Sequence, residues 1–175
     1  MKRMKHNILL TGRPGIGKST AIKKIAERID TVEIGGFWSQ EIKVRGKRVG
    51  FSIETLCGKK GVLAHIKFSQ GPRVSKYRVN IQDIDTIAVS SMETARVKEA
   101  IIVIDEIAKM ELYSDKFKHE VLNCLETGRV LATIQKRKHP FLNEIRSRDD
   151  VIIIEVTETN RDEIPSKVLS LIGFL

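Results

Sequence analysis

The chain has 175 residues, the length of one ordinary domain, and its 31 Lys and Arg against 22 Asp and Glu give a formal net charge of +9. Such a balance suits polyanionic ligands, meaning nucleotides or nucleic acid. No stretch approaches the roughly 20 apolar residues of a membrane span, and the apolar run near the start is too short for a secretory signal. The two cysteines lie far apart and indicate neither a disulfide framework nor a zinc site. We therefore expect a cytoplasmic protein.

The first predicted element is a short strand at residues 8–10, which runs directly into the sequence GRPGIGKST. This spacing, G-x-x-x-x-G-K-S, is that of a phosphate-binding loop, and apolar residues at i, i+3, i+4 and i+7 between 22 and 29 predict the helix that should follow it. Glycines let backbone N–H groups approach phosphate oxygens, Lys18 supplies a charge for the β- and γ-phosphates, and the Ser19 hydroxyl is placed to ligate Mg²⁺. The predicted ligand is a nucleotide polyphosphate. The residues predicted to bind it here are Gly12, Arg13, Pro14, Gly15, Ile16, Gly17, Lys18, Ser19 and Thr20.

Alternating apolar and polar residues follow the first helix, at 42–44 and again at 49–53, and further strands are predicted at 62–66 and 76–80. Turn glycines separate the first three of these strands: Gly46, Gly58 and Gly61. The pattern predicts a β-meander inserted after the phosphate loop. Cys57 and Cys124 are both expected to be small buried hydrophobic residues.

The second half alternates between strands and helices. Ser90 and Glu93 form a predicted capping box for a helix that ends near Lys98, and Ser114 is a predicted cap for a helix that Gly128 terminates. Strands are predicted at 101–104, 130–134 and 151–156, and the last helix carries apolar residues at 168, 171 and 172. We therefore expect an α/β fold with a mainly parallel sheet flanked by helices, and a single domain over residues 1–175.

The aliphatic strand at 101–104 ends in Asp105 and Glu106. This pair resembles the Walker B element, in which Asp105 holds Mg²⁺ through the water shell of the metal and Glu106 polarises an attacking water. The end of the strand places one acid near the metal and the next residue slightly beyond it, toward the γ-phosphate. A glutamate at that position favours hydrolysis as the chemistry of the site.

Beyond these two motifs, the stretches GFWSQEIKVRGKRVGF (36–51), DEIAKMEL (105–112) and NRDEIP (160–165) resemble a specific family. It is the small nucleoside-triphosphatase family first named as thermophilic enzymes with phosphatase activity, which includes the cancer-related nucleoside triphosphatase. The resemblance implies a RecA-like P-loop core and Mg²⁺-dependent hydrolysis of nucleoside triphosphates with loose choice of base. Two residues depart from the family's pattern: Ala108 stands where glycine is expected, and Lys43 stands where arginine is expected, without the bidentate fork that a phosphate clamp would use.

Three further residues are candidates for the site. Arg48, in the predicted hairpin, is the candidate cis cation at the γ-phosphate, although a solvated hairpin charge is the simpler interpretation. Asn160 and Arg161 follow the final strand and could touch the base, but a helix cap by Asn160 explains the same pattern.

Two other functions compete with nucleoside-triphosphate hydrolysis. A nucleoside or nucleotide kinase would share the phosphate loop, and the basic segment QKRKHPFLNEIRSR would then be a lid over the phosphate acceptor. A nucleic-acid-dependent ATPase is suggested by the charge, but no known RNA- or DNA-binding module is present and aromatic residues are few, so nucleic acid is not the favoured partner. We expect nucleoside triphosphates as ligands and a monomer.

Overall fold

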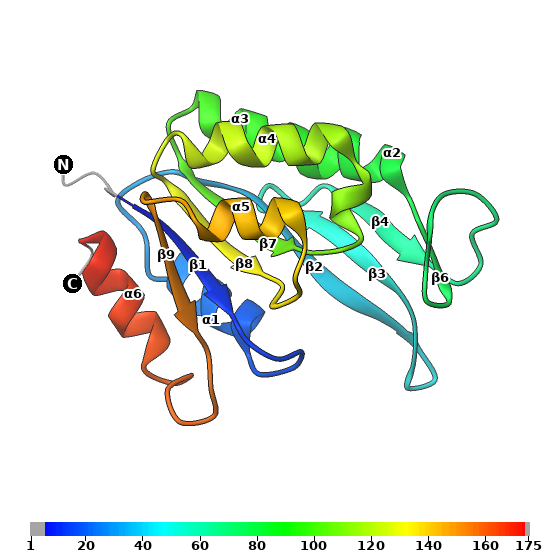
Figure 1. Cartoon of the computed structure of the whole chain (residues 1–175), viewed down its shortest axis with the longest axis horizontal. Coiled ribbons are helices and arrows are strands. Elements are labelled where there is room, and N and C mark those ends of the chain that lie inside the picture. The colour runs from blue at the N-terminus through cyan, green and yellow to red at the C-terminus, as the bar shows by residue number, and fades with distance from the viewer. Residues whose placement is uncertain (1–5, 174–175) are drawn as a thin grey trace.

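One sheet of nine strands organises the chain in the computed structural model, which describes residues 6–173 (Figure 1). From one edge to the other, the strands are β5 (Arg73–Val74), β6 (Tyr77–Val79), β4 (Lys60–His65), β3 (Lys47–Thr55), β2 (Ile34–Val44), β7 (Ile101–Ile107), β8 (Val130–Ile134), β1 (Asn7–Thr11) and β9 (Val151–Glu155). The pairs from β2 to β9 are parallel and the pairs from β5 to β2 are antiparallel. The sequence prediction of an α/β fold is confirmed.

Helices cover both faces of the parallel half of the sheet (Figure 1), and its central strands β1, β7 and β8 are accordingly buried along almost their whole length and mainly apolar. Helices α1 (Lys18–Ala26) and α6 (Ile164–Ile172) lie on one face, and α3 (Ser90–Val97), α4 (Asp115–Leu125) and α5 (Pro140–Arg146) lie on the other. Successive residues of β1 enter different cores, since Leu9 packs under α3 and α4 while Ile8 and Leu10 pack under α1 and α6.

Strand β2 joins the two halves of the sheet. Its first part, residues 34–38, pairs in parallel with β7, and residues 37–44 pair with β3 in an antiparallel hairpin. Gly36 lies where β2 meets β7, with φ of 107°, and a Cβ there would come within 2.0 Å of the Val103 carbonyl oxygen, so no larger residue fits. The predicted β-meander is therefore present, and it extends the main sheet directly.

The helix that contains Ser90 begins ten residues earlier than the sequence predicted. Asn80 is its cap, with Oδ1 accepting a hydrogen bond from the Asp83 backbone N–H at 3.2 Å, and the chain runs through α2 (Ile81–Asp83) and the π-helical turn η1 (Ile84–Val89) into α3. Ser90 has helical φ and ψ and no capping bond, so the predicted capping box is wrong. The prediction for Ser114 is confirmed, because its Oγ accepts the Phe117 N–H at 3.0 Å.

The basic segment after β8 contains α5, which the sequence analysis missed because the helix is short and its charges mask the apolar pair Leu142 and Ile145. Both of these side chains are buried, so the segment is a packed helix and not the free lid of the kinase hypothesis. Cys124 is buried as expected, but Cys57 is exposed in the turn between β3 and β4. In α6, Leu169 packs into the core, whereas Leu171 is half exposed.

No helix within residues 6–173 is long and apolar enough to span a bilayer.

Asn7 fixes the start of β1 against the turn that joins α4 to β8. Its buried side chain donates from Nδ2 to the Leu125 carbonyl at 2.8 Å and accepts at Oδ1 from the Val130 N–H at 3.1 Å. Asn7→Ala leaves both backbone groups unpaired, so we expect the free energy of unfolding to fall by about 2–3 kcal/mol in urea denaturation. Exposed Asn143 in α5 provides the control, since Asn143→Ala should change stability by no more than about 0.5 kcal/mol. Equal effects of the two variants would contradict the role of Asn7.

Candidate active site

The loop between β1 and α1 is shaped by glycines with positive φ. Gly12 has φ of 146°, and a Cβ on it would come within 2.7 Å of the Val156 carbonyl oxygen. Gly17, with φ of 112°, is the N-cap of α1. A bare backbone therefore lies at the positive end of the helix dipole, as an anion site requires.

Lys18, the first residue of α1, is folded back over this loop. Its Nζ donates to the carbonyl oxygens of Gly12 at 3.0 Å and Arg13 at 3.1 Å, and the side chain is 9% exposed. An ammonium has three donors, and within the described residues these two acceptors leave one donor available. The charge predicted for the phosphates is thus held at the mouth of the loop.

Asp105, at the end of β7, brings the two motifs together. Its Oδ1 accepts hydrogen bonds from Ser19 Oγ at 2.9 Å and from Thr133 Oγ1 at 2.7 Å, so α1, β7 and β8 meet at one oxygen. Burial raises the pKa of this carboxyl, and the bonds from Thr133 and Ser19 oppose that rise. Its second oxygen, Oδ2, is buried and has no hydrogen-bond partner within residues 6–173. An orphaned carboxylate oxygen beside a hydroxyl is a hard oxygen donor set, and it fits Mg²⁺.

The metal would need oxygen ligands from elsewhere, because residues 6–173 contain no group of three or more His, Cys, Asp or Glu that could hold an ion by themselves. This matches the usual behaviour of Mg²⁺ at nucleotide sites, where one or two protein groups, several waters and the substrate phosphates complete the shell.

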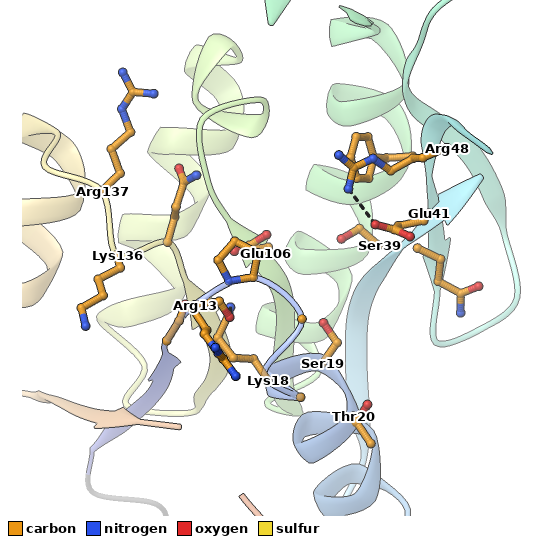
Figure 2. A pocket seen from close by; sticks show the side chains of 17 residues that line it. Arg13, Lys18, Ser19, Thr20, Ser39, Glu41, Arg48, Glu106, Lys136 and Arg137 are labelled. Atoms are coloured by element: carbon orange, nitrogen blue, oxygen red, sulfur yellow. Dashed lines mark hydrogen bonds and ion pairs between the residues drawn. The ribbon is translucent and has the colours of Figure 1, made fainter. Parts of the chain in front are cut away.

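Glu106 faces the open pocket beside Lys18 (Figure 2). Burial raises the pKa of its carboxyl above the ordinary 4.5; the nearby Lys18 charge lowers that pKa and the Asp105 charge raises it further. A carboxylate with a raised pKa is a stronger base than a solvated one, which suits proton abstraction from water.

The pocket above the loop has a volume of about 850 Å³. Its walls come from three places: the phosphate loop with Glu106, the β2–β3 hairpin, and the residues that follow β8 (Figure 2). Its lining residues are Gly12, Arg13, Pro14, Gly15, Gly17, Lys18, Ser19, Thr20, Ser39, Gln40, Glu41, Arg48, Phe51, Glu106, Gln135, Lys136 and Arg137. Of the predicted loop residues, only Ile16 is absent, because its side chain is buried in the core beneath α1.

Arg48 lies in the hairpin wall of the pocket, as the candidate role requires. Its Nη1 pairs with Glu41 Oε1 at 2.7 Å, its Nε donates to the Tyr77 hydroxyl at 3.0 Å, and its guanidinium lies over the Phe51 ring. Lys43 pairs with the same Glu41 at 3.0 Å. Both cations are therefore tied to one carboxylate, and a contact from Arg48 to a phosphate stays a prediction.

The opposite wall carries cations that the sequence analysis did not select. Lys136 Nζ pairs with Glu155 at 2.7 Å, and Arg13 on the loop forms an ion pair with Glu158. Arg137 has no ion-pair partner in the described part of the chain. The signal that could have found this wall is topological: β8 is the neighbour of β1, so the residues after its carboxyl end must lie beside the phosphate loop.

Asn160 and Arg161 do not line the pocket. The Asn160 side chain is used by its own loop, since Oδ1 accepts the Thr157 N–H and Nδ2 donates to the Glu155 carbonyl, both at 2.8 Å. Arg161 is exposed. The structure does not bring either residue together with the phosphate loop, and their contact with a base stays a prediction.

Glu111 is a buried acid that sequence reasoning passed over. Burial holds the pKa of its carboxyl well above 4.5, the Glu106 charge adds to the rise, and its Oε2 has no hydrogen-bond partner in the described chain. It follows the Asp105–Glu106 strand end in a short 3₁₀ turn, Glu111–Tyr113.

Comparison with known proteins covers nearly the whole chain. A protein-family model described as NTPase matches residues 7–169. The nucleoside-triphosphatase THEP1 of Thermotoga sp. (strain RQ2) is 44% identical over 168 residues, covering 95% of each chain. THEP1 of Aquifex aeolicus is 39% identical over 175 residues, covering 94% of this chain and 98% of the relative.

Two solved structures share the fold. The crystal structure of THEP1 from the hyperthermophile Aquifex aeolicus superposes with a TM-score of 0.85 at 38% identity, covering 95% of this chain and 99% of that one. The solution structure of a human cancer-related nucleoside triphosphatase has a TM-score of 0.82 at 32% identity, covering 96% and 97%.

Lys18→Ala tests the phosphate loop. The ammonium would make charge-assisted bonds to phosphate worth about 1.5–3 kcal/mol each, so we expect calorimetry to show triphosphate affinity reduced by at least about tenfold, and phosphate release to be nearly abolished. Lys24→Ala, an exposed position on the same helix, is the control and should behave like the wild type. Normal turnover by Lys18→Ala would remove the assignment of the loop.

Proposed function

Because this chain belongs to the NTPase family and is a nucleoside triphosphatase, we propose that it releases the terminal phosphate of nucleoside triphosphates with Mg²⁺ as cofactor. The main support for the proposal is the hydrogen bond from the Ser19 hydroxyl, in the phosphate loop, to Oδ1 of the buried Asp105. Glu106, the next residue after Asp105, faces the pocket. These groups address the triphosphate and not a base, which supports loose choice among ATP, GTP and other nucleoside triphosphates.

Ser19 and Asp105 are the residues that would hold the metal, Ser19 by its hydroxyl and Asp105 through the water shell. When bound, Mg²⁺ supplies positive charge to the β- and γ-phosphate oxygens as the terminal bond breaks. Thr133 donates a hydrogen bond to one Asp105 oxygen at 2.7 Å, so Oδ2 would be the oxygen available to the water shell of a bound metal.

Glu106 is the proposed general base. Its carboxylate accepts a proton from water as the water oxygen attacks the γ-phosphorus, and the bond from that phosphorus to the β–γ bridging oxygen breaks. The products are the nucleoside diphosphate and inorganic phosphate. Lys18 binds the β- and γ-phosphate oxygens at the loop, and Arg48 is the proposed cation that meets charge developing on the γ-phosphate.

Glu106→Gln should separate binding from chemistry. The amide keeps the size of the side chain but cannot take a proton, so we expect turnover to fall by about 10²–10⁴-fold while the affinity for a nonhydrolysable triphosphate changes little. Phosphate release and calorimetry measure the two quantities. If affinity collapses together with the rate, Glu106 is a binding or structural residue.

The pH dependence of kcat/KM tests the same role of Glu106 as general base. Burial raises the pKa of Glu106, so the base is lost to protonation as pH falls, and the acid limb of kcat/KM should lie above the ordinary value of 4.5. An acid limb at or below 4.5 in phosphate-release assays would place the titrating base elsewhere.

Arg48→Ala tests the cis cation, with Arg137→Ala as the matched variant on the opposite wall. If Arg48 acts only as charge develops, its removal should lower kcat markedly with little change in nucleotide affinity, and Arg137→Ala should stay near the wild type. Where such a cation is decisive it contributes about 10³–10⁵ in rate, and the pairing of Arg48 with Glu41 leads us to expect slow basal hydrolysis. If instead Arg48→Ala has wild-type kcat and Arg137→Ala has a much lower kcat, the cation at the γ-phosphate is Arg137, in the loop after β8.

A further inference from the structure

Positive charge is concentrated in the β-meander. Residues 41–80 contain ten of the 31 Lys and Arg but two of the 22 Asp and Glu, so this segment carries a net +8 of the chain's +9. The rest of the molecule is almost balanced. A charge this uneven points to a polyanionic partner for the meander itself.

Strand pairing gathers most of these cations at one edge. Val44 pairs with Lys47 at the tip of the first hairpin, the last residue of β4, His65, pairs with Arg78, and Val74 pairs with Tyr77 beside the second hairpin turn. The turns at 45–46 and 75–76 and the first residues of the loop 66–72 therefore lie at the same end of the strands, which is also the carboxyl end of β2 and so the end that holds the nucleotide pocket. The loop then returns along β6, where the Val79 N–H donates to the Pro72 carbonyl oxygen at 2.9 Å. We call six cations there the basic edge: Arg45, Lys47, Lys67, Arg73, Lys76 and Arg78.

The basic edge has no acid to balance it. None of its six side chains forms an ion pair with a carboxylate within residues 6–173, and all of them except the half-buried Arg78 are exposed. Arg73 and Arg78 donate to the carbonyl oxygens of Ser75 and Gly71, which are neutral acceptors and leave the charge uncompensated. The basic edge is therefore ready for anions from outside.

A hollow of about 460 Å³ opens beside Lys67 of the basic edge, between the loop after β4 and the start of α2. Phe68 lines it together with Lys67 and three residues that have amide side chains, Gln70, Asn80 and Gln82; the Asn80 Oδ1 is already occupied by the helix cap. Aromatic rings stack on bases, and amides bond to base edges. This lining matches an unpaired nucleobase, in contrast to the charged lining of the triphosphate pocket.

The basic edge and the nucleotide pocket are connected through the Tyr77 side chain. Lys76 Nζ lies 5.5 Å from the centre of the Tyr77 ring, and the Tyr77 hydroxyl accepts a hydrogen bond from Arg48, which lines the triphosphate pocket. In Figure 1 this end of the sheet, with the loops around β6, projects at the end of the molecule away from α6.

We propose that the basic edge binds single-stranded nucleic acid, with phosphates along the six cations and an unpaired base in the hollow beside Phe68. The bound nucleic acid does not occupy the triphosphatase site, so this binding is a function in addition to the proposed hydrolysis. Single strands fit better than duplexes because a base can enter the hollow only when it is unpaired.

The first test measures binding of fluorescein-labelled RNA and DNA single strands of about 12 nucleotides by anisotropy, without nucleoside triphosphate, so the result does not depend on hydrolysis. The variant replaces Lys47, Lys67 and Lys76 by Gln, and the matched control replaces the exposed Lys24, Lys116 and Lys167 by Gln. Each triple removes three charges, so only position differs. We expect the first triple to weaken binding roughly 10- to 100-fold at 0.1 M salt and to lower the slope of log Kd against log salt by about 2, and the control to change Kd less than about threefold.

The second test concerns the hollow. Phe68→Ala should weaken single-strand binding roughly 5- to 150-fold, the range that removal of a stacking ring produces, while leaving the salt slope unchanged. Phe68→Leu keeps an apolar side chain against His65 and removes the ring, so it should lose most of the same affinity. Both variants should keep wild-type nucleoside-triphosphate hydrolysis and melting temperature, which separates lost binding from lost folding.

Several results would overturn the proposal. They are equal losses in the two lysine triples, no loss in Phe68→Leu, or duplex DNA bound as tightly as single strands. Preferential binding to phosphatidylserine vesicles over oligonucleotides would identify the basic edge as a membrane surface instead.

Discussion

One carboxylate oxygen, Oδ1 of Asp105, is the point on which the site depends. It receives the Ser19 hydroxyl from the start of α1 and the Thr133 hydroxyl from β8, while Asp105 itself ends β7. Three elements that are far apart in sequence are thereby fixed within hydrogen-bond distance of one atom. The carboxyl is 1% exposed, and an acid so deeply buried is costly unless it is bonded and has a cation or proton to balance it. The second oxygen, Oδ2, has no hydrogen-bond partner within residues 6–173 and therefore points to a cation as part of the ligand.

The second constraint is the double pairing of β2. Because its first part belongs to the parallel sheet and its second part to a hairpin, the hairpin continues past the carboxyl edge where the phosphate loop lies. Arg48 and Phe51 on β3 consequently form a wall of the pocket above the phosphate loop. Gly35 and Gly36 permit this arrangement, since a Cβ at either position would meet Ala95 or the Val103 carbonyl. These two glycines thus allow β2 to lie close against α3 and β7, where it begins the hairpin that forms the wall.

Two of the cations that line the pocket, Arg48 and Lys136, are paired with neighbouring carboxylates. Arg48 with Glu41 and Lys136 with Glu155 stand on opposite walls, each at 2.7 Å, and both pairs are partly exposed. Exposed pairs of this kind contribute little stability, so their main effect is to orient long side chains. Lys18, by contrast, is held by carbonyl oxygens, which direct its charge without neutralising it. The Lys18 ammonium is thus held at the mouth of the loop, at the proposed phosphate site.

The sequence by itself determined the features whose chemistry is local. The loop glycines and Lys18 lie within eight residues, and the acids Asp105 and Glu106 are adjacent. The apolar run that precedes each of these motifs is enough to indicate a buried parallel strand. It also identified Ser114 as a cap, because a cap bond spans only three residues. It failed at Ser90, where Asn80 provides an earlier start and the helix continues through a π-helical turn that no capping pattern reveals.

Only the tertiary structure decided which distant residues meet. Thr133, Lys136 and Arg137 reach the site because β8 lies between β7 and β1, and strand order is set by the packing of whole elements and not by any local pattern. The same holds for Asn160, whose polar groups are consumed by its own loop, and for the gathering of the basic edge from three separate turns. Which residues lie close together across the sheet depends on the order of its strands. That order depends on how the side chains fill the two hydrophobic cores, one on each face of the sheet.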